Sequence, residues 1–152
     1  MATISLCMIV KNEEDVLDRC LSSVSDLVDE IIVVDTGSTD SSREIAARFT
    51  EKVFDFPWRD DFAAARNESF SHASMDYCMW LDADDILLDA DQAAFLSLKS
   101  SLSPDISVVM APYHTGFDEN GQVTFSYYRE RLIKNHAGMA WTGAVHEVIT
   151  PT

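Results

Sequence analysis

Three aspartates, Asp82, Asp84 and Asp85, stand within four positions directly after the apolar run Tyr77–Leu81. Such a run with a polar end is typical of a buried strand in an α/β sheet, where ligands bind beyond the carboxyl ends of the strands. Two carboxylates about 4 Å apart repel by roughly 4 kcal/mol at an effective dielectric of about 20, which favours a bound cation or a raised pKa. In a continuing strand Asp82 and Asp84 point the same way and can chelate a hard divalent ion. The alternative is a solvated acidic loop that caps the next helix.

The elements that must position these acids alternate along the chain. Continuous apolar runs predict strands at Ile4–Val10, Glu30–Asp35, Lys52–Phe56 and Tyr77–Leu81. Apolar residues at helical spacing predict helices at 12–24, 41–49 and 60–73, and a fourth around 95–102. We therefore expect an α/β fold, with a Rossmann-like, mostly parallel sheet and helices on both faces.

The helix at 60–73 should pack on this sheet through Phe62, Ala65, Phe70 and Ala73. The pattern changes in the last third of the chain, where glycines separate candidate strands at 106–111, 124–129 and 144–149. We therefore expect one domain overall, with an α/β region at 1–103 and a small β-rich C-terminal extension at 104–152.

Three loops follow the predicted strands, Lys11–Glu14, Asp35–Asp40 and Asp82–Asp85. The carboxyl ends of parallel strands meet at one edge of a sheet, so these loops should line one crevice. A lysine, a buried aspartate and an acid cluster placed together in this way suit a nucleotide, a diphosphate and a metal.

The composition of the chain limits the classes of partner that it can bind. Eleven basic against 26 acidic residues give a formal net charge of −15 over 152 residues, which argues against general affinity for nucleic acids or anionic membrane surfaces. No apolar run approaches transmembrane length, and the amino terminus lacks the basic start of a signal peptide. Cys7, Cys20 and Cys78 have the wide spacing of buried thiols, which favours a reducing, cytoplasmic setting.

The chain resembles the family-2 glycosyltransferases, whose nucleotide-sugar-binding domain has the GT-A fold. Four motifs carry the resemblance, in the family's order: Ile9–Glu14, Val33–Asp40, Ala65–Asn67 and Trp80–Asp85. The segment Trp141–Glu147 is similar to one bacterial subgroup that is often joined to helical repeats.

The resemblance implies a role for each matching residue at the nucleotide. Lys11 and Glu13 would contact the nucleoside, and Asp35 would accept a hydrogen bond from the base, a uracil imide. Asp82 would contact the ribose or share the metal, and Ala83 belongs to the same nucleotide-binding segment.

The remaining matches concern the metal and the chemistry. Asp84 would be the principal ligand of a divalent metal, Mn²⁺ or Mg²⁺, with His146 as a further candidate ligand because imidazole suits Mn²⁺. Arg66 would pair with phosphate or order the acid loop, defined here as residues 82–85. Glu147 is the candidate catalytic base, although a surface glutamate on a final strand would look the same.

The implied reaction is a single displacement with inversion at the anomeric carbon. The donor would be a nucleoside-diphosphate sugar, UDP-linked, and the acceptor hydroxyl would belong to a saccharide, lipid or protein. Family members are usually longer than 152 residues. We therefore expect a C-terminally truncated chain with a complete donor site and a partial acceptor side.

Three other interpretations stay open at this point. A nucleotide-sugar-binding module without turnover would carry the same motifs. Asp35–Ser38 after an apolar strand also matches the catalytic loop of aspartic proteases, in which two such aspartates share a proton, so a homodimer would be required. Asp82 and Asp84 could serve a haloacid-dehalogenase-like phosphotransferase, but Ile86 stands where that pattern needs Thr or Val.

Overall fold

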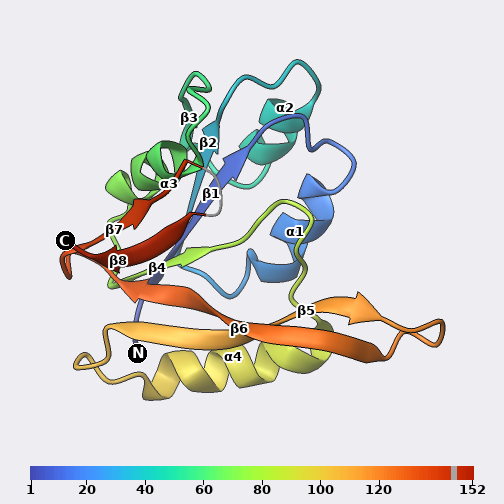
Figure 1. The fold of residues 1–152 in the computed structure, drawn as a ribbon, viewed down its shortest axis with the longest axis vertical. Helices are drawn as coiled ribbons and strands as arrows, with labels where there is room; N and C mark the ends of the chain where they lie inside the picture. Colours follow the sequence, from blue (N-terminus) through green and yellow to red (C-terminus); the bar gives the residue numbers. More distant parts are fainter. Residues whose placement is uncertain (145–146) are drawn as a thin grey trace.

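A computed structural model describes residues 1–144 and 147–152. Its main sheet has six strands in the order β3-β2-β1-β4-β6-β5 (Figure 1). The strands are β1 (Ile4–Val10), β2 (Glu30–Asp35), β3 (Val53–Asp55), β4 (Tyr77–Trp80), β5 (Val108–Phe117) and β6 (Val123–Lys134). The strands β7 (Met139–Thr142) and β8 (Val148–Pro151) form a separate antiparallel pair.

The first four strands are parallel, as the alternation of elements predicts. Strand β1 lies between β2 and β4 and is buried on both faces, because its continuous apolar run has no polar face to expose. The connecting helices are α1 (Leu17–Val24), α2 (Ser42–Ala47), α3 (Phe62–Ser71) and α4 (Asp89–Ser101).

Helices cover both faces of the sheet, which confirms the expected architecture. On one face, α1 packs Leu17, Cys20, Leu21 and Val24 against β1 and β2, together with residues of α2 and α4. On the other face, α3 packs against the opposite side of β1 and β2. The three cysteines are free and buried, as predicted.

The predicted inner face of the helix at 60–73 is confirmed at Ala65, Phe70 and Ala73, which are buried or pack against the core, but not at Phe62. Phe62 is 39% exposed and contacts Trp58 edge to face, whereas Arg66 and Ser69 are buried. Hydrophobic spacing could not predict the burial of Arg66, because this charge is paired with two carboxylates from other parts of the chain.

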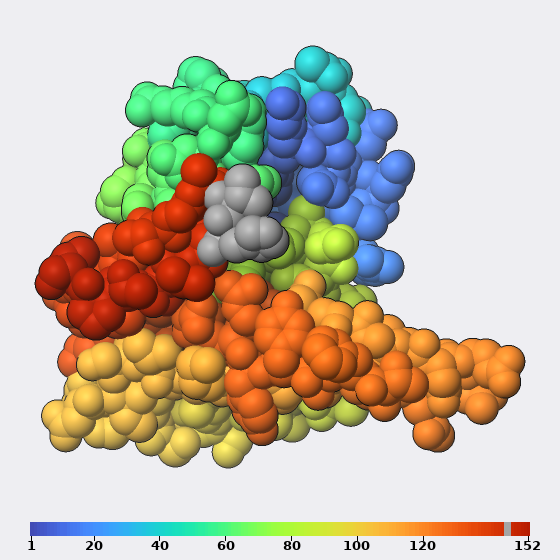
Figure 2. Space-filling view, in the orientation of Figure 1, coloured from blue at the N-terminus to red at the C-terminus, as the bar shows by residue number. Residues whose placement is uncertain are grey.

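The last third of the chain extends the main sheet. Strand β6 pairs antiparallel with β4, and β5 pairs with β6 in a long hairpin that projects from the body of the molecule (Figure 2). Both strands are longer than their apolar runs predict, and β8 begins at Val148 rather than at 144. In the described part of the chain, no helix has the length and apolar character needed to cross a membrane.

Candidate functional site

The carboxyl ends of β1, β2 and β4 lie at one edge of the sheet. Val10 at the end of β1 is in register with Asp35 at the end of β2, and Trp80 at the end of β4 is in register with Cys7 of β1. The loops after these strands are therefore neighbours, as expected, and β1 runs through the middle of the group (Figure 1).

Two of these loops are joined by hydrogen bonds between side chains and backbone. Asn12 has a φ of 53° and accepts from the Thr39 amide through Oδ1 at 2.8 Å. The Ser42 hydroxyl accepts from the Glu13 amide at 2.8 Å, and Glu14 accepts from the Ser41 amide at 2.9 Å. The loops 11–14 and 38–42 therefore hold each other in place before any ligand binds.

Asp35 is 3% exposed and presents one unsatisfied oxygen. Its Oδ2 accepts from the amides of Gly37 and Ser38 at 3.1 and 3.0 Å and lies 3.8 Å from Nη1 of Arg43. Its Oδ1 is buried without a hydrogen-bond partner among the described residues. An unpaired buried acceptor costs about 1–3 kcal/mol, and a donor on a ligand would remove this cost.

The acid loop is a closed turn. The Asp85 amide donates to the Asp82 carbonyl at 2.9 Å, and the Asp85 carboxylate accepts from the Asp82 amide, also at 2.9 Å. Burial raises the pKa of Asp85, and the charges of Asp82 and Asp84 add to this, although the Asp82 amide and Arg131 act in the opposite direction. The side chain at Asp84 is exposed.

The negative field of the acid loop reaches the loop after β1. Burial raises the pKa of Glu13, and the charges of Asp84, Asp82 and Asp40 raise it further. Carboxylates from two strand ends are thus close enough to repel one another, and a bound cation would relieve that repulsion.

Arg66 joins the acid loop to the C-terminal segment. Its Nη2 contacts Oδ1 of Asp82 at 2.7 Å and its Nε contacts Oε1 of Glu147 at 2.8 Å. The guanidinium also lies 4.5 Å from the ring centroid of Trp80 and 5.2 Å from that of Trp141. Two carboxylates and two aromatic rings thus compensate the burial of this charge.

The remaining predicted residues are placed as follows. Lys11 is exposed at the start of its loop and makes no ion pair with another described residue, and Ala83 is buried within the acid loop. His146 lies outside the described residues. The structure therefore brings Arg66, Asp82 and Glu147 into contact and places Glu13 within the field of the acids, while Asp35 lies at the next strand end.

The acids provide hard oxygen donors for a divalent ion. Among the described residues, no group of three or more His, Cys, Asp or Glu side chains is gathered tightly enough to hold a metal by itself. A Mg²⁺-like ion nevertheless fits here, because it binds proteins through one or two carboxylates and takes its other ligands from phosphates and water. Asp84 is exposed and Asp82 is half-buried, and the charges of both repel Glu13.

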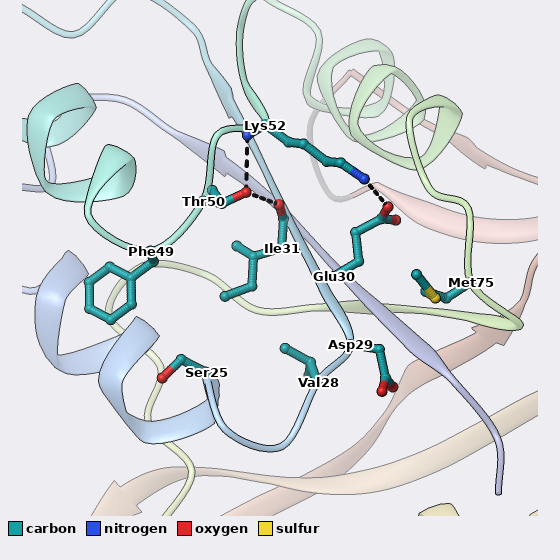
Figure 3. Close-up of a pocket in the computed structure, with 9 residues that line it drawn as sticks. All are labelled: Ser25, Val28, Asp29, Glu30, Ile31, Phe49, Thr50, Lys52 and Met75. Atoms are coloured by element: carbon teal, nitrogen blue, oxygen red, sulfur yellow. Dashed lines mark hydrogen bonds and ion pairs between the residues drawn. The ribbon is translucent and has the colours of Figure 1, made fainter.

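A cavity of about 300 Å³ lies at the opposite end of β2, lined by Glu30, Lys52 and neighbouring residues (Figure 3). It is unrelated to the three loops, because β2 begins at Glu30 and ends at Asp35. We place the ligand site at the carboxyl ends of the strands rather than in this cavity, because the unsatisfied Asp35 oxygen and the acid loop are there.

Three further residues support the site although the sequence analysis gave none of them a role, and of the three only Arg131 lies outside the four motifs. Arg131 of β6 contacts the acid loop, Trp80 packs beneath three arginines, and Asn67 binds the backbone of Trp141. Asn67 had a signal, since it follows Arg66 in one of the four motifs.

Comparison with known proteins identifies the family of this chain. Residues 5–146 match the family described as Glycosyl transferase family 2. The chain belongs to this family. Membership sets aside the aspartic protease and phosphotransferase interpretations.

Two relatives illustrate the similarity. A TPR repeat-containing protein of Synechococcus elongatus is 38% identical over 98% of this chain. The prophage-derived glycosyltransferase SunS of Bacillus subtilis is 30% identical over 89% of it. The chain spans 36% of the length of each relative.

The fold is also that of solved GT-A glycosyltransferases. Glucosyl-3-phosphoglycerate synthase of Mycobacterium tuberculosis, crystallised with UDP, superposes with a TM-score of 0.61 and 27% identity over 76% of this chain and 45% of that one. A second crystal structure of the synthase, with Mg²⁺ and UDP, gives a TM-score of 0.50 and 31% identity over 56% of this chain and 34% of that one.

Proposed function

We propose that this chain is the donor-binding part of a metal-dependent, inverting glycosyltransferase that uses a UDP-linked sugar. The observation that carries the proposal is the unsatisfied Oδ1 of the buried Asp35, at the same sheet edge as the acid loop. A buried acceptor suits the imide N–H of uracil, and the acids suit a metal-bound diphosphate. The related synthase was crystallised with Mg²⁺ and UDP, which supports both the uracil contact and the metal-bound diphosphate in this proposal.

In this proposal the nucleoside lies across the interlocked loops. Asp35 accepts from the base, Lys11 and Glu13 flank the nucleoside, and the acid-loop segment Asp82–Ala83 meets the ribose. The hydrogen bonds between the loops 11–14 and 38–42 hold this surface in shape, so little ordering remains to be done when the nucleotide binds.

Asp84 would hold the metal, Mn²⁺ or Mg²⁺, with Asp82 as a second ligand and His146, outside the described residues, as a third. The ion would supply neutralising charge to the departing diphosphate. Arg66 keeps Asp82 oriented by its contact with Oδ1.

Glu147 would act as the base. The acceptor oxygen attacks the anomeric carbon as the bond to the diphosphate breaks, and Glu147 takes the hydroxyl proton. Its side chain is 14% exposed and is held by Arg66 through Oε1. An attack from the side opposite the leaving diphosphate inverts the anomeric carbon.

The acceptor is a saccharide, lipid or protein bearing a free hydroxyl, and residues 104–152 would begin its side of the site. We place this chemistry in the cytoplasm, where three free buried thiols are compatible with the reducing conditions.

Titration calorimetry tests the donor site. UDP, GDP and CMP are titrated with and without Mn²⁺ or Mg²⁺, and we expect UDP to bind best and only weakly without metal. Asp84→Asn should abolish the metal-dependent part, and Asp35→Asn should reduce the preference for UDP. Asp89→Asn, on the exposed first turn of α4, is the control. If wild type bound none of the nucleotides in a metal-dependent way, the proposal would be wrong.

Turnover separates an enzyme from a binding module. Slow hydrolysis of a UDP-sugar that Asp84→Asn abolishes would support a transferase. Tight binding without hydrolysis, and without transfer to any acceptor offered, would instead support a module that holds the nucleotide sugar.

A further inference from the structure

Strand β6 carries a one-residue bulge at Arg131. In the pairing of β5 with β6, Val109 is in register with Leu132 and the next residue, Met110, with Glu130, so Arg131 has no partner on β5. Leu132 and Ile133 pack into separate hydrophobic clusters, and Arg131 before them is also buried. A bulge re-aims the side chain at its position, and bulges recur beside active sites.

The re-aimed side chain contacts the last residue of the acid loop and the end of the strand that leads into the loop. Nη1 of Arg131 donates to the carbonyl of Trp80, the last residue of β4, at 3.1 Å and to Oδ2 of Asp85 at 3.3 Å. The guanidinium lies 3.9 Å from the ring centroid of Trp80 and 4.8 Å from that of Tyr113. Its side chain is 10% exposed.

Arg131 and Arg66 contact different carboxylates of the acid loop. Arg66 binds the side chain of Asp82, whereas Arg131 binds that of Asp85. Oδ2 of Asp85 also accepts from the Asp82 amide. Both guanidinium groups lie near the ring of Trp80. Two of the loop's three carboxylates are thereby fixed, and the third, on Asp84, is left exposed to solvent.

We propose that Arg131 is a positioning residue of the donor site: from the bulge in β6 it locks the acid-loop turn through Asp85, so that Asp82 and Asp84 are set for the metal-bound diphosphate. This inference rests on the proposed function for its ligand, but the locking of the turn is a property of the chain alone. It acts through Asp85 and the Trp80 carbonyl, not through contact with substrate.

The geometry calls for arginine rather than lysine. One planar group bonds a carbonyl and a carboxylate and also covers an aromatic ring, which a compact ammonium cannot do at once. Arg131→Lys therefore keeps the charge and loses the lock. Arg129→Lys is the matched control, because Arg129 lies 5.0 Å from the same Trp80 ring but pairs with Glu130 and not with the acid loop.

Amide hydrogen exchange tests the lock without any ligand. The amides of Asp82 and Asp85 are both hydrogen-bonded within the turn. They should exchange about tenfold faster in Arg131→Lys than in Arg129→Lys, since a hydrogen bond to a charged group is lost. Asp85→Asn, which removes the charge that Arg131 faces, should loosen the same amides. Equal protection in Arg131→Lys and Arg129→Lys would overturn the inference, whatever Asp85→Asn does.

Calorimetry then tests the consequence for the donor. The affinity for Mn²⁺ in the presence of UDP should fall by about tenfold in Arg131→Lys, as for other residues that orient metal ligands, while metal-free UDP affinity is unchanged. Asp85→Asn should cost less in the Arg131→Lys background than in wild type, because the two changes share the contact between Arg131 and Asp85. Additive losses, or an equal loss in Arg129→Lys, would refute the role. If wild type bound no metal-dependent UDP, the proposed function would fail, and hydrogen exchange would still decide whether Arg131 locks the turn.

Discussion

Asn67 binds both backbone polar groups of Trp141. Its Nδ2 donates to the Trp141 carbonyl at 2.9 Å, and its Oδ1 accepts from the Trp141 amide at 2.8 Å. The side-chain amide of Asn67 on α3 thus satisfies the backbone hydrogen bonds of Trp141 in β7, as a neighbouring strand would. Because Arg66 binds Glu147, two successive residues of α3 hold both ends of the segment 141–147.

Replacing Asn67 by Asp should destabilise the fold by about 1–3 kcal/mol, since a carboxylate oxygen would face the Trp141 carbonyl without a proton between them. Urea denaturation at neutral pH measures the loss. Asn120→Asp, in the exposed turn between β5 and β6, is the control. A midpoint for Asn67→Asp that matches this control would show that the paired contact contributes nothing.

Asn12 has two separable roles, a left-handed backbone and an acceptor for Thr39. Asn12→Gly keeps the first role and loses the second, whereas Asn12→Ala loses both. We expect stability to fall in the order Asn, Gly, Ala, with about 1 kcal/mol between Gly and Ala, because alanine is strained at positive φ.

Thermal denaturation of these variants gives the order, and UDP titration should follow it because the loops 11–14 and 38–42 form the proposed nucleoside surface. Equal stability of Asn12→Gly and Asn12→Ala would mean that the loop relaxes to a negative φ.

Glu13→Gln should stabilise the metal-free chain at neutral pH. Burial and the nearby acids raise the pKa of Glu13, so its ionised form is disfavoured by folding. The gain should be full at neutral pH and should vanish as acid protonates Glu13 in both the folded and the unfolded chain. Paired urea titrations across this range measure the gain, with Asp15→Asn, on the exposed part of the same turn, as the control. A constant difference at all pH values would contradict this origin.

Glu30 should make stability depend on pH in the opposite sense. Burial alone would raise its pKa, but hydrogen bonds from Lys52, Ser5 and Ser74 outweigh burial and lower the pKa to about 2 (Figure 3 shows the Lys52 contact). The folded value lies below the unfolded one of about 4.3, so the contribution is complete above about pH 4.3 and is lost as the pH falls to about 2.

Glu30→Gln should therefore cost about 2 kcal/mol at pH 7, a figure reduced for the half-exposed Lys52, and progressively less toward pH 2. Denaturant midpoints at a series of pH values follow the loss, and exposed Glu51→Gln serves as the control. A cost that persists unchanged at the acid end would assign it to packing instead.

The sequence predicted the central strands well because their signal is local. The bounds of β1 and β2 are confirmed, since an uninterrupted apolar run can be buried on both faces only in the middle of a parallel sheet. The ends of β5 and β6 were not predictable, because half-exposed hairpin strands mix polar and apolar residues.

At the candidate site, the positions of the loops followed from the order of the strands, whereas the contacts between side chains did not. Arg66 was identified only by resemblance, and its burial depends on Asp82 and on Glu147, which is 81 positions away in the sequence. Arg131 had no signal, since a bulge is a mismatch between two strands and neither strand records it alone.

The bulge at Arg131 also decides which side chains each face of the hairpin presents. Side chains alternate along a strand, so deletion of this one residue would bring 126–130 into the alternation set by β4 and turn all five to the opposite face. Tyr127, which now packs edge to face with Tyr113, would exchange sides with Tyr128. In an alignment of relatives, a one-residue gap at this point would mark proteins whose projecting hairpin presents a different surface.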